Sequence, residues 1–152
     1  MLKPILLVED NPNDLELTLI ALSKSQLANQ VIVVRDGAEA LDYLHRRGEY
    51  AQRPVGSPAV ALLDLKLPKV DGLEVLKEIR TTDGLRALPV VMLTSSREEQ
   101  DVVNSYELGV NAYVVKPVDF TEFVRAIADL GIFWAVLNEP PPGSQKYIRP
   151  TK

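Results

Sequence analysis

The chain has 152 residues, 46% of them hydrophobic and 25% charged, as is typical of one globular domain with a buried core. With 17 basic and 21 acidic residues its net charge is −4, which argues against a protein that binds nucleic acid through a basic face. Cysteine is absent, so disulfides and thiolate metal sites are excluded. We find neither a signal peptide nor an apolar run of about 20 residues, and therefore expect a cytoplasmic protein with no membrane span.

Short apolar runs alternate along the chain with longer segments of helical period. We expect five strands at residues 4–8, 31–34, 59–63, 90–93 and 112–115, each apolar on consecutive positions as in a sheet covered on both faces. We expect five helices at residues 12–25, 38–47, 72–82, 98–108 and 120–137, the first opened by Asn11 as a cap and Pro12 at the first helical position. This alternation predicts an α/β fold, a doubly wound parallel sheet with the flavodoxin-like strand order 2-1-3-4-5.

Two segments fall outside this alternation. Residues 48–58 (GEYAQRPVGSP) form the one long internal loop that we expect, and Gly48 is the predicted stop of the preceding helix. Residues 138–152 contain three consecutive prolines, which favour an extended or flexible tail over a helix. We therefore divide the chain into one domain, residues 1–137, and a proline-rich tail, residues 138–152.

Polar side chains collect where the predicted strands end. Glu9 and Asp10 follow the first strand, Asp64 the third, Thr94 the fourth and Lys116 the fifth. Each has a simpler explanation when taken singly, such as a helix cap for Asp10 or a solvated surface charge for Lys116. Because parallel strands present their carboxyl ends at one edge of the sheet, however, all five converge on one pocket. Clustered carboxylates repel one another without a cation, and Mg²⁺ prefers carboxylate oxygens, so we predict a magnesium site there.

Four motifs carry a family resemblance: ILLVEDN (residues 5–11), LLDLKLPKVDG (residues 62–72), VVMLTSS (residues 90–96) and YVVKP (residues 113–117). In this order and spacing they resemble the receiver domain of bacterial two-component response regulators, over about residues 3–137. The resemblance implies that Asp64 accepts a phosphoryl group. It also implies that Asp10 and Asp64 hold Mg²⁺, that Glu9 acts partly through water, and that Lys66 contributes its backbone carbonyl.

The same resemblance assigns roles around the phosphoryl group. Thr94 would hydrogen-bond it and Lys116 would pair with it, while Tyr113 matches the aromatic residue that turns inward on activation. The bond from Lys116 to Pro117 is expected to be cis. Thr94 and Tyr113 would thus form a switch that alters the face built from the fourth helix, the fifth strand and the fifth helix.

A finer resemblance concerns the partner. The GEYAQRP loop, the segment SYELGVNAYVVKPVDF (residues 105–120) and the extended last helix are similar to stand-alone regulators paired with bacterial phytochrome-type histidine kinases. We therefore expect a sensor histidine kinase, with a phosphohistidine, as the phosphodonor. His45 is the one histidine of this chain, and we expect it to be an exposed residue with no role as donor or ligand.

The last predicted helix suggests self-association. Only 15 residues follow residue 137, too few for an effector domain. Apolar residues follow a heptad-like pattern along residues 120–137 and cover nearly the whole circumference of residues 130–137, including Trp134. One stripe of the helix would pack on the sheet. The remainder would be exposed, which predicts a homodimer joined through this helix.

Three other classes fit less well. Phosphatases similar to the haloacid dehalogenases carry a second aspartate two residues after the nucleophile, where this chain has Lys66. A scaffold that works without phosphorylation would lack one or more of the acidic residues, and here the set is complete. Dinucleotide binding is disfavoured because no G-x-G-x-x-G follows the first strand. We therefore predict a phosphoacceptor that assists its own phosphorylation and dephosphorylation and is otherwise no enzyme.

Overall fold

The computed structural model describes residues 3–24, 29–117, 119, 121–122 and 125. Five parallel strands form one sheet in the order β2-β1-β3-β4-β5, as predicted. The strands are β1 (Ile5–Val8), β2 (Val31–Val34), β3 (Val60–Leu63), β4 (Val90–Thr94) and β5 (Ala112–Val115). The helices are α1 (Pro12–Lys24), α2 (Gly37–His45), α3 (Gly72–Thr81) and α4 (Glu99–Glu107), with one 3-10 turn at Gly48–Tyr50. Of the predicted fifth helix, Thr121, Glu122 and Arg125 are described and helical. The other residues of this predicted helix, including all of its hydrophobic ones, and the predicted tail, residues 138–152, lie outside the described residues.

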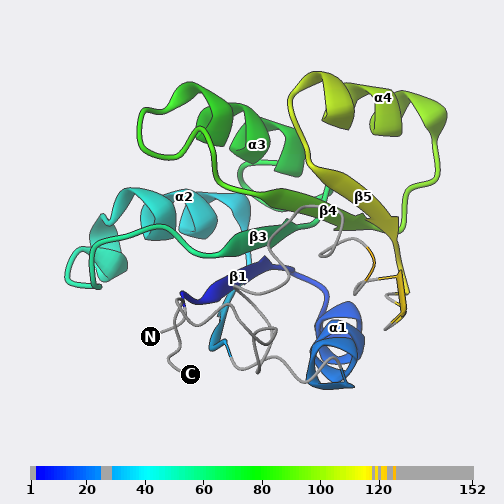
Figure 1. Ribbon diagram of the computed structural model, residues 1–152, viewed down its shortest axis with the longest axis horizontal. Helices are drawn as coiled ribbons and strands as arrows, with labels where there is room; N and C mark the ends of the chain where they lie inside the picture. Colours follow the sequence, from blue (N-terminus) through cyan, green and yellow to red (C-terminus); the bar gives the residue numbers. More distant parts are fainter. Residues whose placement is uncertain (1–2, 25–28, 118, 120, 123–124, 126–152) are drawn as a thin grey trace, which may run out of the picture.

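The sheet is covered on both faces (Figure 1), with α2, α3 and α4 on one side and α1 on the other. The alternation of side chains along a strand explains the two resulting cores. In β1, Leu6 and Val8 pack into the core beneath α2 and α3, whereas Ile5 and Leu7 pack into the core beneath α1. All four are at most 1% exposed, and burying one such side chain contributes about 1.5–3 kcal/mol.

Short polar side chains cap the N-termini of α1, α2 and α3, a position that Asn and Asp favour. Asn11 Oδ1 accepts a hydrogen bond from the Asp14 amide at 3.0 Å, which confirms the predicted cap of α1. Asp36 and Asp71 do the same for α2 and α3, at 2.7 Å from the Glu39 amide and 3.1 Å from the Glu74 amide. The first turns of these helices are thereby held at the edge of the sheet where the strands end.

The end of α2 differs from the prediction. The helix stops at His45, and Arg46 takes a left-handed conformation with φ of 56°, two residues before the predicted stop at Gly48. The reason is local: the Arg46 guanidinium donates two hydrogen bonds to the Arg53 carbonyl, at 2.9 and 3.1 Å, and so draws the chain back on itself.

The loop between α2 and β3, residues 46–59, is organised around Arg53. Its guanidinium lies 4.2 Å from the centroid of the Tyr43 ring, a cation–π contact. It also donates to four backbone carbonyls, those of Tyr43, Leu44, Pro54 and Gly56. The predicted long loop is therefore a folded extension of α2.

His45 is placed differently from the prediction of an exposed residue. Its side chain is only 20% exposed, and Nε2 lies 2.8 Å from Glu78 Oε2 of α3. The helical register explains this, because the last turn of α2 faces α3.

Among the described residues, no helix is both long and apolar enough to cross a membrane.

Candidate acidic metal centre

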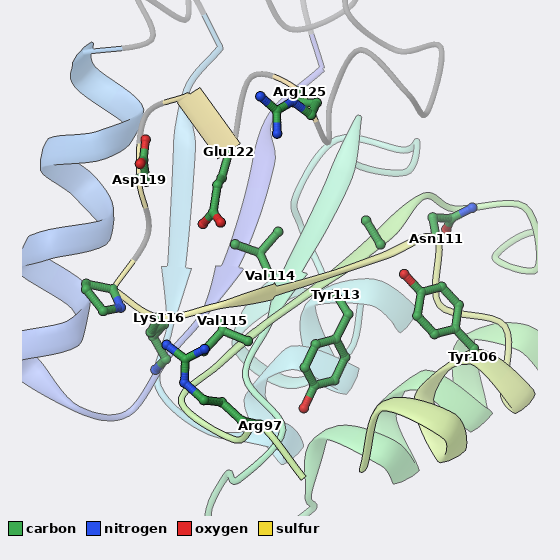
Figure 2. Close-up of a pocket in the computed structure, with 12 residues that line it drawn as sticks. Arg97, Tyr106, Asn111, Tyr113, Val114, Val115, Lys116, Asp119, Glu122 and Arg125 are labelled. Carbon is green, nitrogen blue, oxygen red and sulfur yellow. The ribbon is translucent and has the colours of Figure 1, made fainter. Parts of the chain in front are cut away.

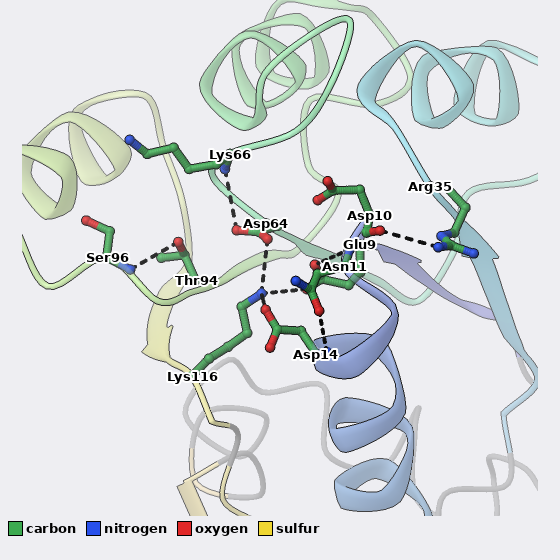
Figure 3. A network of polar contacts seen from close by, with 10 residues as sticks. All are labelled: Glu9, Asp10, Asn11, Asp14, Arg35, Asp64, Lys66, Thr94, Ser96 and Lys116. Carbon is green, nitrogen blue, oxygen red and sulfur yellow. Dashed lines mark hydrogen bonds and ion pairs between the residues drawn. The ribbon is translucent and has the colours of Figure 1, made fainter.

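The five predicted site residues converge at the carboxyl edge of the sheet (Figure 3), where β1, β3, β4 and β5 end. Glu9 and Thr94 are 1% exposed, Asp64 7% and Lys116 9%. Asp10 lies nearer to solvent. One carboxylate oxygen from each of Glu9, Asp10 and Asp64 lies within 4.8 Å of the other two. Three hard oxygen donors are therefore within reach of a single cation.

Lys116 is the centre of the charge network. Its Nζ donates to Glu9 Oε1 at 2.6 Å, to Asp14 Oδ2 at 2.9 Å and to Asp64 Oδ2 at 3.0 Å. Asp14 was not among the predicted site residues, because those are the residues that directly follow strands. Asp14 lies in the first turn of α1, directly after β1, and this position at the same edge of the sheet was the available signal.

Burial and ion pairing act in opposite directions on the pKa values of Glu9 and Lys116. Burial raises the pKa of Glu9 above its usual range, and the neighbouring charge of Asp64 raises it further, whereas the hydrogen bond from Lys116 opposes the shift. For Lys116, burial alone would lower the pKa, but the hydrogen bonds that its ammonium donates to Glu9, Asp14 and Asp64 outweigh burial and raise the pKa. Lys116 therefore stays charged throughout the physiological range.

Asp64 is held by its own loop. Its amide donates to the Val8 carbonyl at 3.2 Å, and its Oδ1 lies 3.4 Å from the Lys66 amide nitrogen. The Lys66 side chain points away from the carboxylate (Figure 3). Behind the loop, Gly72 at the start of α3 packs so closely that an added Cβ would overlap the Asp64 carbonyl oxygen. The backbone that carries Asp64 is thus pressed against the first turn of α3, a role of Gly72 that the motif alone does not reveal.

Ser96 connects the two residues that the resemblance assigns to a switch. Its amide donates to Thr94 Oγ1 at 3.3 Å, and its carbonyl accepts a hydrogen bond from the Tyr113 hydroxyl at 3.0 Å. Ser96 Oγ in turn donates to Asp101 Oδ2 of α4 at 2.6 Å. Thr94 and Tyr113 are therefore joined through Ser96 in the loop after β4, and only Thr94 and Tyr113 were predicted from the sequence.

Apart from the acidic site, a pocket with a volume of about 640 Å³ lies along β5 (Figure 2). It shares Lys116 with the acidic site and is lined as well by Arg97, Tyr106, Tyr113 and Arg125. It therefore lies on the face expected to respond to the switch. The peptide bond between Lys116 and Pro117, at the end of this pocket, is cis as expected.

Comparison with known proteins identifies the family. The profile of the response regulator receiver domain matches residues 5–128. The chain belongs to the response regulator receiver family. It is 42% identical over 132 residues to response regulator Rcp1 of Synechocystis, covering 87% of this chain and 88% of that protein. Receivers of this family are signalling proteins, and the predicted family assignment is confirmed.

Two solved structures of this family support the phytochrome resemblance. The bacteriophytochrome response regulator RtBRR is 74% identical, with a TM-score of 0.84 over 96% of this chain and 88% of that chain. The bacteriophytochrome response regulator AtBRR is 72% identical, with a TM-score of 0.83 over 91% of this chain and 99% of that chain. The predicted resemblance to phytochrome-associated regulators is thus confirmed as well.

Other homologues show what such sites hold. Rcp1, 41% identical, has been solved bound to Mn²⁺, and the PA1611 receiver domain of Pseudomonas aeruginosa, 29% identical, with a magnesium ion in its active-site cleft. RcpA, a cyanobacterial phytochrome response regulator 42% identical to this chain, has been solved in phosphorylated form. The oxygen donors of Glu9, Asp10 and Asp64 fit a hard divalent ion of this kind.

Proposed function

We propose that this receiver accepts a phosphoryl group on Asp64 from a sensor histidine kinase. The observation that carries the proposal is the position of the Asp64 carboxylate, which contacts the Lys116 ammonium at 3.0 Å and lies in a cluster with Glu9 and Asp10. Such a site combines a nucleophilic oxygen with fixed positive charge for the incoming phosphoryl oxygens.

The transfer is a substitution at phosphorus. A carboxylate oxygen of Asp64 forms a bond to the phosphorus of the kinase's phosphohistidine, and the phosphorus–nitrogen bond breaks. The electron pair of that bond stays on the imidazole nitrogen of the kinase. Lys116 holds one oxygen of the transferred group by charge, and the Thr94 hydroxyl donates a hydrogen bond to another.

The acidic cluster is proposed to hold Mg²⁺. Asp10 and Asp64 would ligate it directly, Glu9 would act partly through water, and the Lys66 carbonyl would complete the protein ligands. When bound, the ion offsets negative charge on the phosphoryl group. The same groups would assist both phosphorylation and dephosphorylation of Asp64. A phosphatase of the haloacid dehalogenase type is the less favoured alternative. Its general acid would occupy the position of Lys66, and the Lys66 side chain points away from Asp64 (Figure 3).

The phosphoryl group is proposed to act through Thr94 and Tyr113. When Thr94 turns its hydroxyl toward the phosphoryl oxygen, the hydrogen bond from the Ser96 amide to Thr94 is disturbed, and with it the loop that accepts from the Tyr113 hydroxyl. Because Ser96 also contacts Asp101 of α4, the change extends to the face formed by α4, β5 and the chain that follows.

The partners are proposed from the same resemblance. The protein is proposed to be cytoplasmic and its kinase to be of the bacterial phytochrome type, because RtBRR and AtBRR, 74% and 72% identical to this chain, are bacteriophytochrome response regulators. We further propose a homodimer joined through residues 120–137, and no binding to nucleic acid because the chain is acidic.

The direct test is Asp64→Asn. With Mg²⁺ and a small phosphodonor such as acetyl phosphate, the wild-type protein is expected to gain the mass of one phosphoryl group, and Asp64→Asn to gain none, because an amide oxygen is a poor nucleophile. Asp83→Asn, a change at a side chain that is 93% exposed, is the matched control and should be labelled normally. Equal labelling of Asp64→Asn and wild type would refute the assignment.

A further inference from the structure

Of the three acidic residues in the cluster, Asp10 is the one held by the fewest contacts. The carboxylates of Glu9 and Asp64 both accept hydrogen bonds from Lys116, at 2.6 and 3.0 Å. Asp10 lies nearer to solvent. Among the described residues, the one hydrogen bond to Asp10 comes from the Arg35 guanidinium, which donates to the Asp10 backbone carbonyl at 3.3 Å.

This contact holds the peptide unit that follows Asp10. The amide of the unit belongs to Asn11 and donates to Glu9 Oε2 at 3.1 Å, while its carbonyl accepts from Arg35. Because a peptide unit is planar, two hydrogen bonds on opposite sides fix its orientation, whereas one alone allows it to turn. That orientation sets a backbone torsion angle of Asp10, and with it the direction of the Asp10 carboxylate relative to the cluster.

Arg35 is in turn held from the α2–β3 loop. It directly follows β2, and its amide donates to Glu39 Oε1 of α2 at 3.1 Å. The other oxygen of this carboxylate, Glu39 Oε2, accepts a hydrogen bond of 2.5 Å from the Tyr50 hydroxyl in the 3-10 turn. Figure 3 shows the Arg35 side chain extending to Asp10 on the side away from Lys116. Three hydrogen bonds in series thus join Tyr50 to the acidic site.

We propose that Arg35 is a positioning residue of the metal centre and that Tyr50 supports it through Glu39. The inference rests on the proposed role of Asp10 as a metal ligand and deepens it. By its charge alone, Arg35 would repel Mg²⁺, so its contribution to binding is the fixed backbone of Asp10. The folded α2–β3 loop thereby sets part of the Mg²⁺ affinity of a site to which it gives no ligand.

The first test is the Mg²⁺ affinity of Arg35→Gln, measured by titration calorimetry. The affinity should fall roughly three- to tenfold, at or below the low end for groups that orient metal ligands, because Arg35 is exposed. Loss of the positive charge alone would raise the affinity instead, so a value equal to or above that of wild type would overturn the proposal. Arg35→Lys keeps the charge and a donor, and should bind Mg²⁺ more tightly than Arg35→Gln.

Arg47→Gln is the matched control, since it removes the same charge from an exposed ion pair with Asp42. It should leave the Mg²⁺ affinity unchanged, and an equal fall in both variants would refute positioning by Arg35. Asp10→Ala separates the two hypotheses. If it loses affinity while Arg35→Gln does not, the role of Arg35 is refuted and that of Asp10 stands. If wild type itself binds no Mg²⁺, the proposed metal site fails instead.

Tyr50→Phe tests the support from the loop. It removes the hydroxyl and keeps the ring, whose centroid lies 5.2 Å from that of Tyr43. The Mg²⁺ affinity should fall about twofold in the wild-type background and not at all in the Arg35→Gln background, because residues that act in series are not additive. Equal falls in both backgrounds, or no fall in wild type, would refute the support from Tyr50.

Two further measurements separate positioning from a direct role. In the metal-free protein, ¹⁵N relaxation should give a lower order parameter for the Asn11 amide in Arg35→Gln than in wild type, and an unchanged value would contradict the proposal. With each protein saturated with Mg²⁺, the phosphoryl mimic beryllofluoride should bind Arg35→Gln as tightly as wild type, as measured by ¹⁹F NMR. Weaker binding at saturating Mg²⁺ would assign Arg35 to the phosphoryl group and overturn its role as a positioning residue.

Discussion

At the scale of single residues, Glu9 and Asp10 are adjacent acids with different surroundings. Both carboxylate oxygens of Glu9 already accept hydrogen bonds, Oε1 from Lys116 at 2.6 Å and Oε2 from the Asn11 amide at 3.1 Å. Asp10 lies nearer to solvent, and its backbone carbonyl is held by Arg35 at 3.3 Å. Asp10 is therefore better placed than Glu9 to give an oxygen directly to a metal ion.

We accordingly predict that Asp10→Ala weakens Mg²⁺ binding by at least about tenfold, since the loss of groups that support a metal site already has effects of this size. Titration calorimetry is the measurement, with Asp42→Ala, which alters an exposed ion pair with Arg47, as control. Equal Mg²⁺ affinities for wild type and Asp10→Ala would contradict the proposed ligand set.

The strand-end residues could be predicted because a parallel sheet brings all its carboxyl ends to one edge. Asp14 and Ser96 could not be predicted in the same way. The contact of Asp14 with Lys116, 102 positions away, depends on the conformations of both side chains. Ser96 acts mainly through its backbone amide and carbonyl. The position of Asp14 in the first turn of α1 places it at the same edge of the sheet, but neither contact itself leaves a pattern in residue types.

At the scale of elements, the strands were the most predictable part, because each predicted strand is an uninterrupted apolar run, and the three central strands β1, β3 and β4 are buried throughout. Four of the predicted strands agree closely with β1, β2, β3 and β5, and β4 extends one residue further, to Thr94. Helix ends were less predictable. The end of α2 depends on Arg46 reaching Arg53, seven residues further along the chain, a side-chain contact that helical period does not encode.

The start of α3 gives a prediction at this scale. In Gly72→Ala the new methyl group would overlap the Asp64 carbonyl oxygen, so the Asp64 loop must shift. We expect a loss of about 1–3 kcal/mol in unfolding free energy, as for other overpacked sites, together with slower phosphorylation by acetyl phosphate. Urea denaturation and mass spectrometry are the measurements.

Gly37→Ala is the matched control for that effect. Gly37 is the first residue of α2, and a methyl group there would overlap the carbonyl of Val70 in the loop before α3, so the change should also destabilise the fold. Its phosphorylation rate should be closer to that of wild type, because the displaced carbonyl is that of Val70, six residues along the loop from Asp64, and not that of Asp64 itself. If both variants slow phosphorylation to the same extent, the effect of Gly72 is one of general stability and not of position.

At the scale of the whole molecule, the acidic site and the pocket along β5 meet at Lys116. The charge network of the acidic site and the pocket along β5 are therefore neighbours that share Lys116. The apolar sequence of residues 130–137 lies beyond that pocket along the chain and outside the described residues, so the dimer remains a prediction from sequence alone.

Trp134→Glu tests the proposed dimer. If the last helix joins two copies across a twofold axis, one substitution removes an aromatic side chain and adds a charge twice in the interface, each buried aromatic contributing about 1.5–3 kcal/mol. Sedimentation velocity at micromolar concentration should show a dimer for wild type and a monomer for Trp134→Glu, with phosphorylation of Asp64 retained. A monomeric wild type, with and without beryllofluoride, would contradict the dimer, and loss of folding in the variant would place Trp134 in the core.

The Arg53 clamp has a practical consequence for work on this domain. The Arg53 guanidinium binds the backbone of the α2–β3 loop, and the loop tip, residues 54–56, projects into solvent. Val55 is 82% exposed, and a Cβ on Gly56 would meet no atom within 4 Å. The two ends of this tip are anchored by the hydrogen bonds from Arg53 to the Pro54 and Gly56 carbonyls. The tip is therefore a rigid attachment point for a fluorophore or spin label. A probe there would report the orientation of the domain in a complex with its kinase, without adding bulk to the acidic edge.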